Sequence, residues 1–128
     1  MSLDLYDPHV FPTLLNVCHR FGVGPTTSIE AESYFRKLLL SYDADTAPSL
    51  AAWLEQEIAA RFLSLAGVPE WLQAAEWPVV DGAPLVFAGQ LDYSVLDNIL
   101  AGQMFHDDTS VYVFIGRKIA PVVVMQQM

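Results

Sequence analysis

The sequence has little cysteine, few basic residues and no long hydrophobic run, and each shortage excludes a class of protein. With one cysteine in 128 residues, no disulfide forms within the chain, and we expect a reducing, cytoplasmic environment. The longest apolar run, residues 119–125, is interrupted by Pro121 and is far shorter than the roughly 18 residues of a membrane-spanning helix. The acidic N-terminus lacks the basic segment of a signal peptide. We therefore predict a cytoplasmic protein that does not span a membrane.

Basic residues are outnumbered by acidic ones. Six Lys and Arg stand against 15 Asp and Glu, which gives a net charge of −9. Nucleic acids and anionic membrane surfaces bind through Lys and Arg, so both are disfavoured as partners. An acidic balance suits either plain solubility or electrostatic steering toward a basic protein partner.

Hydrophobic residues are abundant enough for a core. They make up 53% of the chain and charged residues 16%, the reverse of the balance typical of disordered proteins. A chain of 128 residues is also close to the commonest domain size. We therefore expect one folded domain over residues 1–128.

Helical spacing of apolar residues and helix start and stop signals dominate the first half. A first helix is predicted to begin at Asp7-Pro8 and to end at Gly22. The motif Thr27-x-x-Glu30 predicts a capping box at the start of a second helix. A third apolar stripe covers residues 50–65 and is ended by Gly67.

Strand-like composition dominates the second half. Residues 85–88 and 111–115 are rich in β-branched and aromatic residues, and 119–125 is a predicted hairpin partner for the second of these runs. A short helix is expected over 94–102. Helices followed by strands predict a single α+β domain, with a helical part (1–67) and a sheet part (76–128). Three N-terminal helices should pack on a small C-terminal antiparallel sheet.

The segment 76–115 opens on EWP at 76–78, followed by DGAPLVFAGQLD at 81–92. These residues resemble the signature of the YwqG-like family of bacterial proteins, and the resemblance covers about a third of the chain. It implies a bacterial source and a sheet in the second half, and it implies no reaction. Relatives of such domains recur among small acidic immunity proteins that neutralise bacterial toxins.

Two groups of residues invite a catalytic interpretation. His106, Asp107 and Asp108 are metal-ligand types, but neighbouring strand residues point to opposite faces, so a solvated turn is the better interpretation. Cys18 lies on the apolar stripe of the first helix, and His19 points about 100° away from it, which predicts a buried thiol. Because no nucleophile elbow, phosphate loop or C-x-x-C pair is present, we expect neither enzyme activity nor a metal or cofactor.

Aromatic and polar residues of the middle segment suggest binding. Trp71 and Trp77 lie in a proline-bounded loop, where they either serve as exposed binding hot spots or cover the junction of helices and sheet. Gln90 and Asp92 share one face of a strand, either as a polar recognition surface or as the end of that strand, where Asp92 would start a helix.

Our leading hypothesis is a non-catalytic protein-binding module, such as a toxin-neutralising immunity protein, whose carboxylates block a basic surface. The alternatives are a small-molecule-binding domain with a pocket near Gln90 and Tyr93, or a homodimeric assembly module paired through residues 122–125. The predicted binding residues are Trp71, Trp77, Glu70, Glu76, Asp81, Gln90, Asp92, Tyr93, Asp107 and Asp108.

Overall fold

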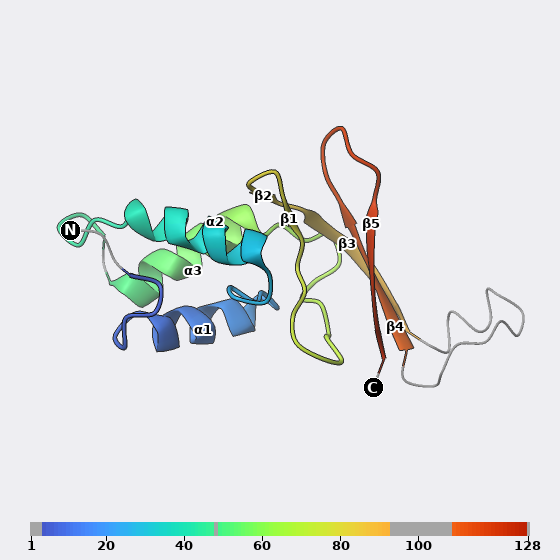
Figure 1. The fold of residues 1–128 in the computed structure, drawn as a ribbon, viewed down its shortest axis with the longest axis horizontal. Coiled ribbons are helices and arrows are strands. Elements are labelled where there is room, and N and C mark those ends of the chain that lie inside the picture. The colour runs from blue at the N-terminus through green and yellow to red at the C-terminus, as the bar shows by residue number, and fades with distance from the viewer. Residues whose placement is uncertain (1–3, 48, 93–108, 128) are drawn as a thin grey trace, which may run out of the picture.

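The computed structural model describes residues 4–47, 49–92 and 109–127. Its elements are three helices followed by strands, which confirms the predicted α+β class. Figure 1 shows the helices gathered at one end of the molecule and the sheet at the other. The helices are α1 (Phe11–Arg20), α2 (Ile29–Leu40) and α3 (Leu50–Arg61).

The start of α1 was predicted wrongly. Val10, not Asp7, precedes the first helical residue, and no side chain caps the helix. The Asp7 carboxylate instead accepts the backbone N–H of His9 at 2.8 Å, which closes a tight turn before the helix. The predicted end is confirmed, because Gly22 takes a left-handed φ of 72° just after Phe21, the last flanking residue.

Serine caps both other helices. Ser28, rather than Thr27 of the predicted capping box, accepts the N–H of Ala31 at 3.0 Å, while the Thr27 hydroxyl donates to the carbonyl of Gly24. Ser49 accepts the N–H of Ala52 at 3.1 Å in the same way. The hydroxyl of Thr27 or that of Ser28 could have capped the second helix. Because the Thr27 hydroxyl bonds the Gly24 carbonyl, Ser28 is the cap.

The third helix is one turn shorter than its apolar stripe indicated. It ends at Arg61, and Ser64 then forms a parallel bridge with Phe87. The carbonyl of Phe87 accepts the N–H of Leu65 at 2.8 Å. Pairing with a strand therefore ends the helix before Gly67.

The sheet is antiparallel with the strand order β3-β4-β5. A separate two-stranded hairpin turns at Asp81 and Gly82, both with positive φ, which matches the two-residue turns of tight hairpins. The predicted pairing of the last two strands is confirmed, although the final strand begins and ends later than expected. The strands are β1 (Val79–Val80), β2 (Ala83–Pro84), β3 (Val86–Asp92), β4 (Thr109–Ile115) and β5 (Val122–Gln127).

The inner face of the three-stranded sheet changes from apolar to polar along the strands. The register aligns residues of this face in three rows, and each row takes one residue from each strand. The rows are Phe87–Phe114–Val122, Gln90–Tyr112–Val124 and Asp92–Ser110–Gln126. The polar end of this face therefore needs hydrogen-bond partners from another part of the chain.

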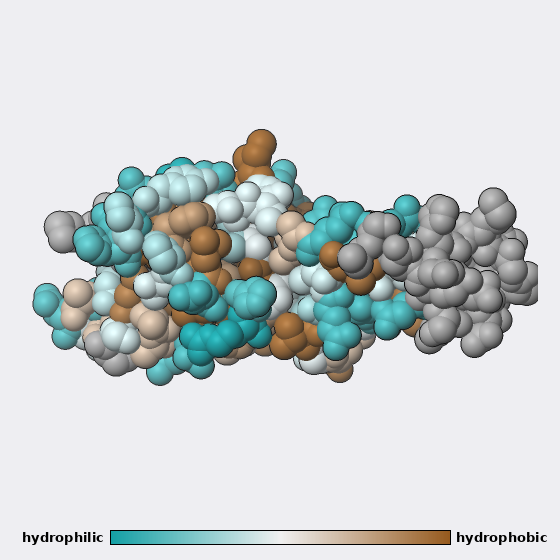
Figure 2. Space-filling view, turned by 90° about the horizontal axis from the view of Figure 1, so that it is seen from below, coloured by the Kyte–Doolittle hydropathy of each residue, from teal (hydrophilic) through white to brown (hydrophobic). Residues whose placement is uncertain are grey.

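Aromatic rings join the helices to the apolar end of the sheet. Trp77 packs against Phe62 and Phe114 with ring centroids 5.5 and 5.4 Å apart, and Phe62 stacks on Phe35 of α2 at 5.5 Å. Trp77 is only 3% exposed. On the side of the molecule that Figure 2 shows, hydrophobic residues lie in separate patches among hydrophilic ones, over both the helices and the sheet.

Removal of the Trp77 side chain should destabilise the whole fold. We expect Trp77→Ala to lower the free energy of unfolding by about 3–5 kcal/mol, because it empties the centre of the aromatic cluster. Urea denaturation followed by circular dichroism measures this loss. Leu40→Ala, at an exposed position of α2, is the control and should change the stability by less than about 0.5 kcal/mol. Equal losses would contradict the central role of Trp77.

Candidate functional site

Residues 70–76, here called the clamped loop, cross the inner face of the sheet without regular secondary structure. Figure 1 shows this segment between the helices and the sheet. Backbone N–H and C=O groups in such a position need partners, because they have none in a ladder or helix of their own. Side chains from all three strands supply them.

Gln126 of β5 holds the middle of the clamped loop. Its Oε1 accepts the N–H groups of Leu72 and Gln73, each at 2.9 Å. Its Nε2 donates to the carbonyl of Ala74 at 2.7 Å and to the carboxylate of Glu76 at 2.9 Å. The side chain is 2% exposed and uses both donors and both acceptor sites of its amide. Gln126 therefore has one orientation only, and so does the loop.

Tyr112 and Gln90 hold the start of the clamped loop. The Tyr112 hydroxyl donates to the carbonyl of Glu70 at 2.8 Å and accepts the N–H of Leu72 at 3.2 Å. The Gln90 amide accepts the N–H of Glu70 at 2.9 Å and donates to its carbonyl at 3.3 Å, as a neighbouring strand would. Burial raises the pKa of the Tyr112 hydroxyl, so the proton that it donates stays in place.

Trp71 ties the clamped loop to the end of α1. Its ring lies over Tyr112, with centroids 4.3 Å apart, and its indole N–H donates to the carbonyl of Gly22 at 2.7 Å. The ring is half-buried. Both tryptophan side chains therefore cover the junction of helices and sheet, as the second of the two interpretations expects. The alternative of an exposed hot spot does not apply to Trp77, because its N–H bonds to the Leu85 carbonyl inside the core.

Three of the predicted binding residues come together at one edge of the sheet. Gln90 bonds the backbone of Glu70 and also donates to the carboxylate of Asp92 at 2.9 Å. Ser110 donates to the same carboxylate oxygen at 2.8 Å. The prediction that Gln90 and Asp92 share a face is confirmed. Glu70 and Asp92 are both exposed. Gln90 joins them, because it bonds the backbone of Glu70 and the carboxylate of Asp92.

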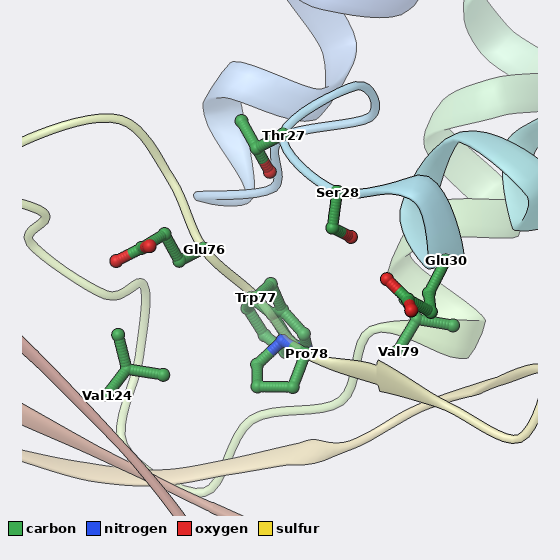
Figure 3. A pocket seen from close by; sticks show the side chains of 8 residues that line it. All are labelled: Thr27, Ser28, Glu30, Glu76, Trp77, Pro78, Val79 and Val124. Carbon is green, nitrogen blue, oxygen red and sulfur yellow. The ribbon is translucent and has the colours of Figure 1, made fainter.

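Glu76 lies on the other side of the clamped loop, in a pocket of about 270 Å³. Figure 3 shows Glu76 and Glu30 on opposite sides of Trp77 and Pro78. The hydroxyls of Thr27 and Ser28 line the same pocket. The pocket thus combines two carboxylates with apolar lining residues such as Trp77, Val79 and Val124, a combination that suits a positively charged side chain.

The remaining predicted residues are dispersed or lie outside the described part. Asp81 lines a different pocket, of about 390 Å³, beside Tyr34 and Lys37 of α2. Tyr93, Asp107 and Asp108 fall outside the described residues, as does the predicted helix over 94–102. The site that the structure assembles is therefore the clamped loop with Asp92 and the Glu30–Glu76 pocket.

Among the described residues, no lysine or arginine forms an ion pair with the carboxylates of this site. The ion pairs found among the described residues all join positions between 4 and 61, namely Arg20–Glu55, Arg36–Asp4, Arg36–Glu32 and Arg61–Glu57. Residues 62–116 contain no lysine or arginine. The carboxylates of Glu76 and Asp92 are instead held by amide and hydroxyl groups, and Gln90 holds Glu70 through its backbone; none of these contacts compensates the negative charge.

The position of Cys18 in the structure does not suit a nucleophile. Its thiol is fully buried among the apolar residues of α1, and this burial raises its pKa well above the usual range. A thiol that stays protonated is a poor nucleophile. Among the residues described, no group of three His, Cys, Asp or Glu side chains is placed to hold a metal ion.

Sequence reasoning missed Gln126 and Tyr112, which hold the loop. The expected strand ended at residue 125, so Gln126 fell outside it. One signal pointed to it: Val122, Val124 and Gln126 alternate, which puts Gln126 on the inward-facing side of the strand. Its partner was not predictable, because residues 72–76 are about fifty positions away in the chain.

Comparison with protein-family models, with curated proteins and with solved structures found no match. The resemblance to the YwqG-like family is neither supported nor refuted by it. In the part of the chain that is described, no helix has the length and apolar character needed to cross a bilayer.

Loss of the Gln126 amide should loosen the clamped loop. We expect Gln126→Leu to lower the free energy of unfolding by about 1–3 kcal/mol, because partly buried backbone groups of Leu72, Gln73 and Ala74 lose their partner. Hydrogen exchange of the Leu72 and Gln73 amides should accelerate by more than that of the helices. Gln127→Leu, at the exposed neighbouring position, is the control. If both variants exchange alike, Gln126 does not hold the loop.

The buried thiol gives a second test. We expect Cys18 to react with a thiol reagent such as Ellman's reagent only when the protein is unfolded in guanidinium chloride, because the folded chain shields it and keeps it protonated. The absorbance of the released thiolate measures the reaction. A stoichiometric reaction of the native protein within minutes would contradict the structural role assigned to Cys18.

Proposed function

We propose that this chain is a non-catalytic module that binds a basic protein, and that it acts as an immunity protein neutralising a toxin in the bacterial cytoplasm. The observation that carries the proposal is the rigid, uncompensated acidic surface of the clamped loop. Its carboxylates have no cationic partner in the described residues, although the loop itself is fixed by Gln126, Tyr112 and Gln90.

Rigidity and unpaired charge together favour binding over plain solubility. Charges that serve only solubility need no fixed position, whereas a surface already held in one conformation loses little conformational entropy when it binds a partner. Carboxylates that have no cationic partner among the described residues also stay available to Lys and Arg of another protein. The surface offered to such a partner consists of Glu70 and Asp92 on one side of the loop and Glu76 with Glu30 on the other.

The tryptophans take a supporting role in this proposal. Trp77 is buried and contributes stability rather than contact area. Trp71 is half-buried and lines a pocket of about 480 Å³ with His19, Val68 and Gln73, so part of its ring is available to a partner. The carboxylates therefore provide the recognition, and Trp71 is the aromatic contact beside them.

Partner capture at two ionic strengths tests this function. The tagged chain is incubated with extract of its source cells, and captured proteins are identified by mass spectrometry. We expect a basic partner whose association slows by about tenfold or more at high salt, because screening removes electrostatic steering. Expressed alone the partner should be toxic, and coexpression of this chain should restore growth.

Charge-removing variants separate the proposed surface from net charge. Glu70→Gln with Glu76→Gln should abolish capture and protection, since glutamine keeps the hydrogen bond between position 76 and Gln126 and removes only the charge. Asp45→Asn with Glu55→Gln removes as much charge from the helical part and should have no effect. Equal behaviour of the two pairs, or a partner that is harmless by itself, would contradict the proposal.

A further inference from the structure

The strand β5 has an open edge. It pairs with β4 on one side and, within the described residues, has no strand on the other. Proteins usually protect such an edge with charged side chains, prolines or bulges. Residues Val122–Gln127 contain no charge and no proline, and their register with β4 is unbroken. This edge is therefore competent to pair with another strand.

The outer face of the sheet beside this edge is apolar. Alternate residues of β5 point away from the clamped loop, and two of them, Val123 and Met125, are 58% and 51% exposed. They lie next to Val113 and Val111 of β4. In the described parts of β4 and β5 this face carries no charged residue. A strand added to the edge of β5 would cover part of these two side chains.

The charges around β5 favour a second copy of the same chain. Two of the six basic residues, Arg117 and Lys118, are exposed in the turn that precedes β5. At the other end of the strand Glu76 is bonded to Gln126. In antiparallel self-pairing, the basic turn of each copy extends toward the strand end where the other copy carries Glu76. Elsewhere the net charge of −9 opposes association of two copies.

Self-pairing also restricts the register. Residues directly opposite in an antiparallel pair share a face, so outer residues of one copy must meet outer residues of the other. This requires one residue of β5 to lie opposite itself. With Val124 at that position, Val123 lies opposite Met125 of the second copy, and both exposed apolar residues gain an apolar neighbour.

We propose that the chain forms a homodimer through antiparallel pairing of β5 with β5 of a second copy, centred on Val124, which makes one continuous six-stranded sheet. The proposal goes beyond the function proposed above: the two share the carboxylate of Glu76, whereas Val123 and Met125 of the outer face take part only in the pairing. It identifies the β5 edge as an interaction surface whose partner is the same chain.

Sedimentation equilibrium of the purified chain gives the first test. We expect twice the chain mass of 14.2 kDa, and a monomer for Val123→Lys or Met125→Lys, which place a charge beside the edge. Ile29→Lys, at an 83% exposed position of α2, is the matched control and should stay dimeric. Circular dichroism confirms that each variant is folded. A monomeric wild-type chain overturns the proposal, even if a strand of another protein pairs with this edge.

Cysteine cross-linking tests the register. Opposite residues of an antiparallel pair lie about 4.5–5.5 Å apart between Cα atoms, within the range of a disulfide of about 4.4–6.8 Å. Val124→Cys should therefore form a covalent dimer under mild oxidation, visible on a non-reducing gel. In this register, position 123 of one copy lies two residues away from position 123 of the other, at about 7–8 Å. Val123→Cys should therefore remain uncrosslinked. Equal cross-linking of both variants, or cross-linking of Val123→Cys alone, would contradict the Val124-centred pairing.

Discussion

The structure depends on the hydrogen bonds of an irregular, partly exposed segment that lies between the helices and the sheet. Residues 70–76 lie between the helices and the sheet, where neither a helix nor a ladder satisfies their backbone groups. Buried backbone groups without partners are costly, so the sheet must present polar side chains at the right positions. Gln126 and Tyr112 meet this need with groups that are themselves buried.

This constraint explains why the inner face of the sheet is divided. Near the helices it carries Phe87 and Phe114, which pack against Trp77. Toward the far end it carries Gln90, Ser110 and Gln126, which bond the loop and the carboxylates of Asp92 and Glu76. Amides and hydroxyls hold the loop, and no lysine or arginine among the described residues pairs with these carboxylates. An acidic surface therefore results from the same bonds that stabilise the fold.

Local errors of sequence interpretation had tertiary causes. Asp7 and Thr27 have the chemistry of helix caps, but the chain enters α1 three positions later and α2 one position later. The third helix stops at Arg61 because the following residues pair with β3. The sequence left open whether Trp77 is exposed, and it is buried because Phe62 and Phe114, far apart in the chain, meet around it.

The sequence by itself determined the class of the fold, the order of helices and strands, the turns at Gly22 and at Asp81-Gly82, and the burial of Cys18. These features follow from periodicity and backbone conformation, which act between near neighbours. Only the tertiary structure decided which strand side chains hold the loop and which carboxylates lie together. Those choices depend on contacts such as Gln126 with Glu76, whose distance along the chain no local pattern encodes.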